Sequence, residues 1–389
     1  NRGGRIMSVT APAGFRAAGV VAGLKPSGRP DVAVVVNDGP LDTAAGVFTR
    51  NRVQAAPVQW SRQVLADGRL RAVVLNSGGA NACTGPAGFA DTHRCAEHTA
   101  ALLGIGAGEL AVCSTGLIGV RLPMELLLAG VDKAVAEASV TGAGAAAEAI
   151  CTTDTVSKQA VCAAEGVTVG GMAKGAAMLA PTLATMLVVV TTDAVVDPPT
   201  ADRLLRDACR TTFERVDSDG CMSTNDTVLL LASGASGVSV AAETLGGLVT
   251  DTCADLAGQL VADAEGSTKT IAITVTGAAG EQDALEVGRA VARCNLLKCA
   301  LYGNDPNWGR VLAAVGTTRA AFEPDALDVA INGVWVCRGG APGEPRELVD
   351  LAGREVSIRI DLHAGATELT VWTNDLTDGY VYENSAYST

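Results

Sequence analysis

The threonine hydroxyl with the clearest chemical setting is that of Thr185, in the segment APTLATMLVVVTTDA at residues 180–194. A threonine is a competent nucleophile when it begins a chain, because its own α-amine then accepts the hydroxyl proton. That amine has an ordinary pKa of roughly 7.7 to 8.0, which suits a general base near neutral pH. Thr185 would reach this state if its hydroxyl attacked the accessible carbonyl carbon of the small Ala184 and water cleaved the resulting ester. Taken alone, the same pattern is more typical of an ordinary β-strand.

The other residues that carry chemistry point away from histidine, zinc and nucleotide-phosphate sites. His93 and His98 stand five residues apart, outside the i, i+4 spacing of a helical zinc pair, and no G-x-S-x-G motif accompanies them. The cluster GGMAKG at 170–175 places its lysine before the last glycine, unlike a phosphate-binding loop. GIGAGE at 104–109 lacks the full dinucleotide fingerprint. We therefore expect no metal centre, and glycines that serve turns.

Composition favours a folded protein that binds small molecules in a reducing compartment. The chain has 389 residues, 48% of them hydrophobic, and its net charge of −13 disfavours nucleic-acid and anionic-membrane partners. No run approaches the roughly 20 apolar residues of a membrane helix, and the first residues lack the apolar segment of a secretory signal. The eleven cysteines include no C-x-x-C pair, so we expect free thiols and a cytoplasmic protein.

Hydrophobic patterns predict strands and helices in mixed order, and hence an α/β or α+β fold. Residues 200–215 and 241–264 each place apolar side chains on one helical face, with Thr200 as the expected N-cap of the first helix. Residues 355–373 alternate in polarity and turn at Gly365, which predicts a β-hairpin with one solvated face. The strands are spaced too irregularly for a doubly wound sheet. Further strand-like runs begin near Arg71, Leu110, Met186, Thr227, Thr268 and Leu327.

Eight sequence blocks together resemble one enzyme family. The segment GGMAKGAAMLAPTLATMLVVVTTDA around Thr185 is similar to the self-cleavage segment of the ornithine acetyltransferase family, also called glutamate N-acetyltransferase. No catalytic position of the family pattern is changed. The other blocks follow in the family's order over almost the whole chain: NSGGANACTG at Asn76, STGLIG at Ser114, TTDT at Thr152, STNDT at Ser223, ADAEG at Ala262, NDPNWGR at Asn304 and ENSAYST at Glu383.

The resemblance implies that the chain cuts itself between Ala184 and Thr185. The products would be an α chain of residues 1–184 and a β chain of residues 185–389, which share the core of an N-terminal-nucleophile-like sandwich with an additional α/β region. Thr185 would take acetyl from N-acetylornithine, release ornithine and pass the acetyl group to glutamate, giving N-acetylglutamate for arginine biosynthesis. The resemblance implies no cofactor and leaves open whether acetyl-CoA is a second donor. It also implies two copies of each chain, with no located interface.

The resemblance further implies roles for residues outside the cleavage segment. Thr115 and Gly116 would form the oxyanion hole that stabilises the tetrahedral intermediate. A lysine suits the α-carboxylate of both substrates, and a glutamate suits an ammonium group such as that of ornithine. A functional C-terminus requires the last residues to fold back over the pocket. The implied substrate-binding residues are Thr152 or Thr153, Lys174, Thr185, Glu265, Asn384 and Thr389.

Three other interpretations stay open. An N-terminal-nucleophile amidase or aminopeptidase would share the cleavage and the acyl-threonine but would transfer the acyl group to water. An uncut metabolite-binding protein would keep Thr185 in a strand and run as one polypeptide on a denaturing gel. A paralogue from secondary metabolism would perform the same acyl chemistry in another pathway. Whether glutamate or water accelerates acyl-enzyme turnover distinguishes a transferase from an amidase.

Overall fold

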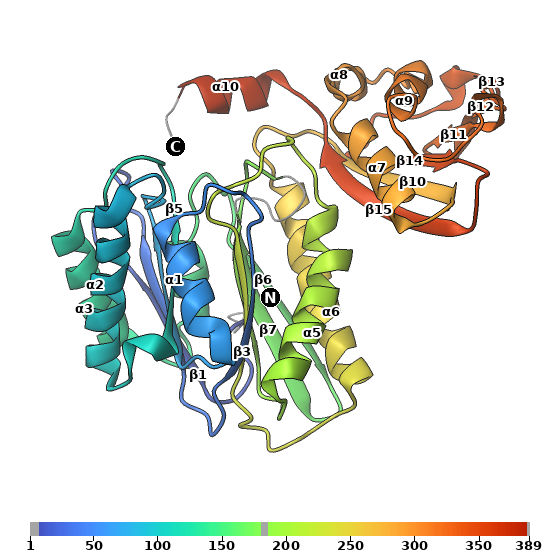
Figure 1. Cartoon of the computed structure of the whole chain (residues 1–389). Helices are drawn as coiled ribbons and strands as arrows, with labels where there is room; N and C mark the ends of the chain where they lie inside the picture. Colours follow the sequence, from blue (N-terminus) through green and yellow to red (C-terminus); the bar gives the residue numbers. More distant parts are fainter. Residues whose placement is uncertain (1–7, 180–185, 387–389) are drawn as a thin grey trace, which may run out of the picture.

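A computed structural model describes residues 8–179 and 186–386 as a four-layer sandwich with a smaller α/β unit beside it (Figure 1). Two mixed β-sheets lie face to face, and helices cover the outer face of each sheet. A third sheet, formed later in the sequence, carries helices of its own. The mixed α/β class that the sequence predicts, a sandwich with an additional α/β region, is therefore confirmed.

The first sheet has the strand order β1-β2-β4-β5, in which β4 and β5 are parallel and the other neighbours are antiparallel. β2, β4 and β5 are buried along their whole length, as expected of strands covered on both faces. Trp60, Cys95 and Leu127 of the covering helices pack against the outer face. The strands are β1 (Phe15–Val20), β2 (Val32–Asn37), β4 (Ala72–Ser77) and β5 (Leu110–Thr115), and the helices are α1 (Ala56–Val64), α2 (Gly85–Leu103) and α3 (Met124–Glu137).

The second sheet joins strands from both sides of the predicted cleavage point in the order β3-β9-β8-β7-β6. β8 and β9 are parallel, and the other neighbouring pairs are antiparallel. Leu205, Cys209 and Leu256 of the covering helices belong to the core on its outer face. The strands are β3 (Thr43–Phe48), β6 (Lys158–Ala164), β7 (Val167–Lys174), β8 (Leu187–Thr192) and β9 (Thr227–Ala232), and the helices are α5 (Pro198–Thr211) and α6 (Ala242–Ala262).

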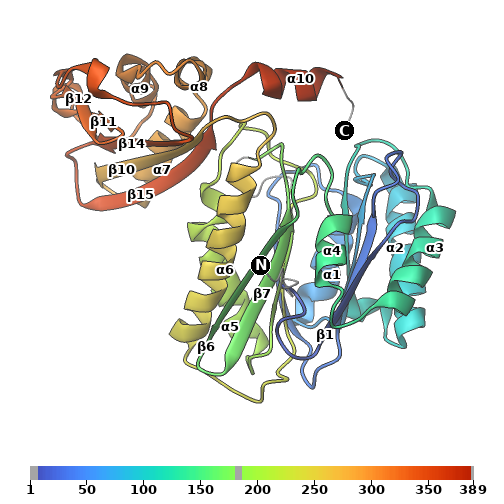
Figure 2. The same cartoon turned by 180° about the vertical axis from the view of Figure 1, so that it is seen from behind.

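Apolar side chains fill the space between these two sheets and form the central core. Phe15 of the first sheet and Met172 of the second both belong to it. The short helix α4 (Ala143–Ala149) lies in the same layer, as the view from behind shows (Figure 2). A Cβ on Gly19 of β1 would stand 1.9 Å from the carbonyl oxygen of Ala145, so glycine is required for α4 to approach the sheet this closely.

The third sheet has the order β13-β12-β11-β14-β10-β15 and its own apolar core, to which Ile273, Ile358 and Val371 contribute. Helix α7 packs on β10 and β15. The strands are β10 (Thr270–Ala278), β11 (Asp328–Ile331), β12 (Val334–Arg338), β13 (Ala341–Pro342), β14 (Glu355–Asp361) and β15 (Thr367–Asn374), and the helices are α7 (Glu281–Ala292), α8 (Asn295–Tyr302) and α9 (Trp308–Val315).

The predicted C-terminal β-hairpin is wrong. β14 and β15 are both present on either side of Gly365, but β10 lies between them, parallel to β14 and antiparallel to β15. Alternating polarity defines which face of a strand is buried and does not define its neighbour. The run near Leu327 likewise divides into the antiparallel pair β11 and β12, joined at Asn332 and Gly333. Both of these residues have positive φ, as tight hairpin turns require.

The two predicted amphipathic helices are present as α5 and α6, but the N-cap of α5 was assigned to the wrong residue. Asp197, rather than Thr200, caps this helix, because its carboxylate accepts the amide N–H of Thr200 at 2.9 Å. Pro198 occupies the first helical position, where its missing N–H has no intrahelical partner to lose. The helix therefore begins two residues before Thr200.

The structure also bears on what the sequence predicts about cysteines, metal sites and membrane-spanning helices. The eleven cysteines are free thiols. Among residues 8–179 and 186–386, the structure contains no cluster of three side chains able to hold a metal ion. Within the same residues, no helix is long and apolar enough to cross a membrane.

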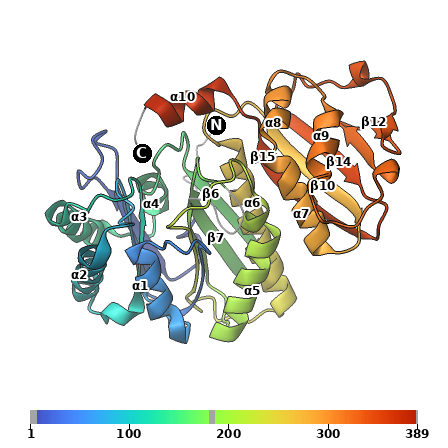
Figure 3. The same ribbon diagram turned by 45° about the horizontal axis from the view of Figure 1, so that its top comes forward.

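The last described helix, α10 (Asp378–Ala386), runs from the third sheet across one end of the sandwich (Figure 3). It contains no buried residue, so polar contacts rather than an apolar face hold it. Tyr302 donates its hydroxyl to Asp378 at 2.6 Å, and Tyr380 donates its hydroxyl to Asp219 at 3.2 Å. This course brings the described C-terminal residues back to the sandwich.

Candidate active site

One end of the sandwich gathers strand ends from both sheets. β5 and β7 end there at Thr115 and Lys174, while β8 and β9 begin there at Leu187 and Thr227. Strand pairing aligns these points, since Lys174 pairs with Leu187, which pairs in turn with Thr227. The strands are apolar along their length, so the polar groups that carry chemistry collect where the strands give way to loops.

Lys174 is the central cation of this end. It is buried, with 2% of the residue exposed. Its ammonium group donates to the hydroxyl oxygens of Thr115 at 3.1 Å and of Thr152 at 2.8 Å. Burial lowers the pKa of Lys174, while the charge of Asp154 acts in the opposite direction. Because the Thr115 hydroxyl accepts from Lys174, its own proton remains able to donate to a third group.

A buried ionic network lies beside Lys174. The side chain of Lys158 is 0% exposed, and its ammonium nitrogen lies 2.6 Å from a carboxylate oxygen of Asp154 and 2.6 Å from one of Asp263. Burial by itself raises the pKa of Asp154, but the charges of Lys174 and Lys158, together with hydrogen bonds from Lys158 and the Gly175 N–H, outweigh this effect and bring the pKa down to about 2. Asp154 is therefore ionised at neutral pH.

Backbone N–H groups complete this network. Asp154 accepts the amide N–H of Thr152 at 3.1 Å and that of Gly175 at 2.7 Å. Asp263 accepts the amide N–H of Thr155 at 3.0 Å. Buried charges are tolerated only when they are paired and hydrogen-bonded in this way. The network fixes the TTDT block to the end of β7 on one side and to the end of α6 on the other.

Gly116 follows Thr115 at a close approach of two backbone segments. Its φ is +134°, and a Cβ at this position would stand 2.5 Å from the amide nitrogen of Gly79. Gly79 donates its N–H to the carbonyl oxygen of Thr115 at 3.0 Å. Only glycine fits at this contact, so the NSGG loop holds the backbone of the STG block in one conformation. A preset backbone of this kind can present donors to a developing oxyanion.

Glu265 lies on the other side of the TTDT block. One of its carboxylate oxygens accepts the hydroxyl of Thr153 at 2.6 Å, and the other accepts the side-chain amide of Asn384 at 2.8 Å. Asn384 belongs to α10, so this contact ties the C-terminal helix to the loop after α6. A cavity of about 310 Å³ opens here, lined in part by Thr153, Glu265 and Glu383. The half-buried carboxylate retains lone pairs that can receive an ammonium group.

Asp226 is a second buried carboxyl group at this end, immediately before β9. None of the residue is exposed, and its Oδ1 accepts the amide N–H of Met186 at 3.1 Å. Burial raises the pKa of Asp226 well above its usual range, although the Met186 N–H, the Ser223 hydroxyl and the charge of Lys174 act to lower it. The carboxyl group of Asp226 therefore contacts Met186, the first described residue after the predicted cleavage point.

Most of the predicted site residues meet at this end of the sandwich. Thr152 and Thr153, which the sequence left as alternatives, make different contacts, the first with Lys174 and the second with Glu265. Ala184, Thr185 and Thr389 lie outside the described residues. The predicted residues that the structure brings together are Thr115, Gly116, Thr152, Thr153, Lys174, Glu265 and Asn384. Their catalytic and binding roles stay predictions.

The sequence reasoning missed Asp154, Lys158 and Asp226. Asp154 and Asp226 stand in the TTDT and STNDT blocks, which were recognised without a role for their aspartates. The signal in the sequence was the position of each charged residue beside an almost uninterrupted apolar strand. A charge at such a position is rarely buried without an oppositely charged or hydrogen-bonding partner. Lys158 begins β6 four residues after Asp154, a spacing that hints at the pair but says nothing of Asp263.

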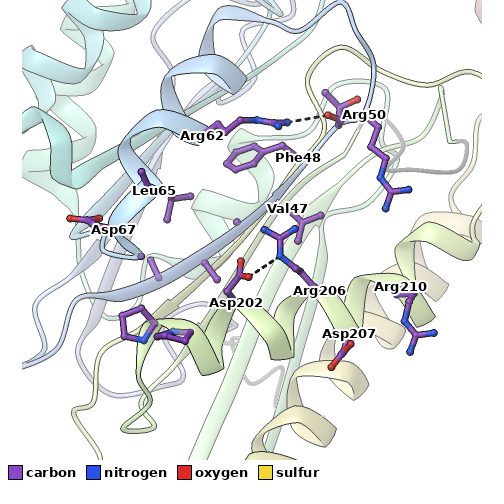
Figure 4. Close-up of a pocket in the computed structure, with 18 of the residues that line it drawn as sticks. Val47, Phe48, Arg50, Arg62, Leu65, Asp67, Asp202, Arg206, Asp207 and Arg210 are labelled. Carbon is purple, nitrogen blue, oxygen red and sulfur yellow. Dashed lines mark hydrogen bonds and ion pairs between the residues drawn. The ribbon is translucent and has the colours of Figure 1, made fainter.

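A larger cavity lies elsewhere on the molecule. A groove of about 1050 Å³ runs along β3 between α1 and α5 (Figure 4). Two of its arginines are paired within its walls, Arg206 with Asp202 at 2.8 Å and Arg50 with Glu214 at 3.4 Å. The described site residues do not line it. The groove is therefore separate from the site at the strand ends.

Known proteins match the chain over nearly its whole length. The model of the ArgJ family matches residues 16–389. A relative from Thermobifida fusca (strain YX), named arginine biosynthesis bifunctional protein ArgJ, is 65% identical over 383 residues, covering 98% of this chain and 100% of the relative. A relative of the same name from Mycobacterium tuberculosis (strain CDC 1551 / Oshkosh) is 57% identical over 392 residues, covering 99% of this chain and 97% of the relative.

Solved structures are similar over part of the chain. A crystal structure of ornithine acetyltransferase complexed with ornithine, from Mycobacterium tuberculosis, is 58% identical over 46% of this chain and 96% of the solved chain, with a TM-score of 0.42. A crystal structure of arginine biosynthesis bifunctional protein ArgJ from Bacillus halodurans is 38% identical over 46% of this chain and 94% of the solved chain, with a TM-score of 0.41.

Proposed function

This chain belongs to the ArgJ family, and we propose that it transfers an acetyl group from N-acetylornithine to glutamate through an acetyl ester on Thr185. Membership of the family makes it an arginine-biosynthesis acetyltransferase. The proposal adds the nucleophile and the two amino-acid substrates. It also adds a self-cleavage between Ala184 and Thr185, which yields chains 1–184 and 185–389.

The position of Met186 is the observation that carries this proposal. Its amide nitrogen is covalently bonded to the carbonyl carbon of Thr185, and its successor Leu187 pairs with Lys174. Lys174 in turn reaches the hydroxyls of Thr115 and Thr152. The chain therefore enters β8 next to the groups that an acyl-transfer reaction requires, which supports the preceding residue, Thr185, as the nucleophile.

The surrounding groups support roles in holding the two substrates. An ammonium group has three donors, and among the described residues the Lys174 ammonium uses two of them on Thr115 and Thr152. The third donor suits the α-carboxylate that both N-acetylornithine and glutamate carry. Glu265 suits the side-chain ammonium of ornithine, since it is an acceptor-only group beside a cavity. Asn384 closes this part of the site from α10.

The chemistry is a pair of acyl transfers through tetrahedral intermediates. The Thr185 hydroxyl attacks the acetyl carbonyl carbon of N-acetylornithine while the Thr185 α-amine accepts the hydroxyl proton. Ornithine leaves with that proton, and the amine of glutamate then attacks the acetyl ester. The hydroxyl of Thr115 and the backbone N–H of Gly116 would stabilise the oxyanion in both steps, each such donor being worth roughly 3 to 4 kcal/mol.

Relatives with more than half of their residues identical are named bifunctional proteins, which supports a second reaction. In that reaction acetyl-CoA would replace N-acetylornithine as the acetyl donor, and N-acetylglutamate would be made directly. We propose no other cofactor. The two chains would stay associated, because strands on both sides of Thr185 build the second sheet. We place the enzyme in the cytoplasm as an assembly of two α and two β chains.

Intact-mass measurement combined with N-terminal sequencing tests the proposal. The purified protein is expected as two chains, the second beginning at Thr185. Thr185→Ala is expected to remain one inactive chain, whereas the control Thr185→Ser keeps a hydroxyl and is expected to be cut and active. Glutamate, rather than water, is expected to accelerate loss of the acetyl group from the enzyme. An intact wild-type chain with full activity would contradict the proposal.

A further inference from the structure

Asn225 joins three segments that lie far apart in the sequence. It stands in the STNDT block, shortly before β9, and only 3% of the residue is exposed. Its side-chain amide donates to the carbonyl oxygen of Ala80 at 2.6 Å and to that of Ser114 at 2.8 Å. These partners are 145 and 111 residues away along the chain. The amide therefore links the loop after β4 and the end of β5 to the segment that leads into β9.

The side-chain amide of Asn225 can take only one orientation in these contacts. Its nitrogen has two N–H donors, and the two carbonyls use both of them. A rotated amide would turn Oδ1 toward two carbonyl oxygens, which cannot donate. Oδ1 instead accepts the hydroxyl of Thr224 at 2.6 Å, and the backbone N–H of Asn225 donates to the hydroxyl of Ser223 at 3.1 Å. The bridge therefore has a single, fixed geometry.

The bond to Ser114 belongs to a series of bonds along the outer edge of β5. This strand is the last of the first sheet, so alternate carbonyls face away from the sheet and require donors from elsewhere. Asn225 supplies the donor at the site end of the strand. The pairs in this series are the Trp60 indole N–H on Leu110 at 3.0 Å, the Ser61 hydroxyl on Val112 at 2.7 Å and the Asn225 amide on Ser114 at 2.8 Å.

Asn225 holds one of the two peptide groups that flank Thr115. The Ser114 carbonyl accepts from Asn225, and the Thr115 carbonyl accepts the N–H of Gly79 at 3.0 Å. Both peptide groups are trans and hence planar, so holding the carbonyl oxygen also sets the direction of the N–H. Two held peptide groups fix the φ and ψ angles of the residue between them. The directions of the Thr115 side chain and of the Gly116 N–H follow from these contacts.

We propose that Asn225 is a positioning residue that sets the geometry of the oxyanion donors on Thr115 and Gly116. The inference rests on the proposed function, in which these two residues stabilise the tetrahedral intermediate. Both donors of the Asn225 amide are occupied by backbone carbonyls, so Asn225 acts through the turn rather than by touching substrate. A preset donor lowers the barrier only when it points to the place where negative charge develops.

The bridge also crosses the predicted cleavage point. Its two acceptors belong to residues 1–184, and its donor belongs to residues 185–389. β8 and β9, which both follow the cleavage point, are paired in parallel. Asn225 therefore connects the oxyanion donors of the α chain to the sheet strands of the β chain. Misplacing reacting groups by about 1 Å can slow an enzyme on the order of 10²-fold, so this connection bears directly on the rate.

Asn225→Ala tests the proposal, because it removes both donors and leaves the backbone unchanged. The kcat of acetyl transfer, counted per cut chain, is expected to fall on the order of 10²-fold. The KM for N-acetylornithine should stay within about twofold of the wild-type value, because oxyanion donors act on the transition state rather than on the bound substrate. An unchanged kcat, or a change confined to KM, would overturn the assignment.

Ser61→Ala is the matched control. Ser61 is 0% exposed, and its hydroxyl donates to the Val112 carbonyl at 2.7 Å and accepts the Val112 N–H at 2.9 Å. The variant therefore loses bonds to the same edge of β5, but two residues before Ser114. It is expected to lower the melting temperature as Asn225→Ala does and to keep kcat within about twofold, because the turn at Gly116 stays held. An equal fall of kcat in both variants would make the effect one of stability and overturn the proposal.

Two further measurements decide the question if Asn225→Ala does not fold. Asn225→Ser keeps a single hydroxyl donor, so its kcat should lie between those of the wild type and an enzyme without the bridge. In the infrared spectrum, the ¹³C-labelled acetyl ester of the wild type should absorb at a lower carbonyl frequency than that of Asn225→Ser, because aligned donors weaken the C=O bond. Equal frequencies would overturn the proposal. In a crystal structure of the cut wild-type enzyme, Nδ2 of Asn225 should lie within about 3.2 Å of both carbonyl oxygens, and the loss of either contact would also overturn it.

Failure of the proposed function and failure of this inference give different results. An uncut wild-type chain with full activity would refute the proposed function itself. A cut, active wild-type enzyme whose Asn225→Ala variant keeps its kcat would refute only the role of Asn225. A folded Asn225→Ala variant that stays uncut would assign Asn225 to the cleavage step and overturn its role in acetyl transfer. Intact mass and steady-state kinetics together separate these outcomes.

Discussion

Replacing Lys158 with methionine is expected to lower the free energy of unfolding by about 3 to 5 kcal/mol. The Lys158 ammonium lies 2.6 Å from both Asp154 and Asp263, and its side chain is 0% exposed. Methionine keeps the apolar stem, so the packing loss is small and the main cost comes from two buried carboxylates that lose their shared cation. The pKa of Asp154, now about 2, should rise because Lys158 is one of the two cations that lower it.

Urea unfolding at pH 7 measures this effect, and Arg206→Met is the control. Arg206 and Asp202 form an ion pair of similar length, 2.8 Å, but their side chains are 59% and 46% exposed. Solvent screens such a pair, so the control should lose only about 0.5 kcal/mol or less. Acetyl transfer should also fall in Lys158→Met, since Asp154 positions the backbone of Thr152. A loss of less than about 1 kcal/mol in Lys158→Met would refute the reasoning that the network is a buried ion pair.

Three other changes test neighbouring parts of the site. Gly116→Ala should lower the free energy of unfolding by about 1 to 3 kcal/mol and abolish most acetyl transfer, because the new Cβ would meet the Gly79 backbone. The control Gly119→Ala, also at positive φ but with open space around the new Cβ, should lose less stability. The pKa of Asp154 is about 2 in the folded protein, against an ordinary value of 3.8. The ionised group therefore contributes about 2 kcal/mol to the free energy of unfolding above pH 4, and this contribution is lost as the pH falls toward 2. Acid unfolding of Asp154→Asn should therefore be flatter in that window, and an unchanged slope would contradict the pairing. Glu265→Gln should raise the KM for N-acetylornithine about tenfold, because it removes the negative charge beside the cavity that would bind the ammonium group. The melting temperature should change little, because this charge is only half-buried. An unaltered KM would exclude ammonium binding at Glu265.

Local patterns predicted the strands and helices better than they predicted strand neighbours. The apolar runs at β4, β5, β8, β9 and β10 and the helical faces of α5 and α6 are readable because burial repeats with the period of each element. The insertion of β10 between β14 and β15 was not readable, because alternating polarity is the same whichever strand supplies the hydrogen bonds. The N-cap of α5 was misplaced because both Asp197 and Thr200 are capping residue types.

In the site, too, local motifs were predictable from the sequence and long-range contacts were not. Its individual blocks were recognisable, since Thr115, Lys174 and Glu265 stand in short motifs whose residue types and order survive without a structure. Their mutual contacts were not, because Lys174 is 59 residues from Thr115 and Asn384 is 119 residues from Glu265. The buried carboxylates were missed for the same reason, since a charged side chain is acceptable in a core only when distant residues neutralise it.

The sequence by itself determined which chemical groups the protein possesses, where apolar stretches must be buried, and which family it belongs to. Only the tertiary structure decided that Asp154, Lys158 and Asp263 form one ionic network and that Asp226 holds the start of β8. The physical reason is that periodicity and motif order are properties of neighbours along the chain. Charge pairing, hydrogen-bond satisfaction and strand order depend on groups that become neighbours only when the sheets close around their core.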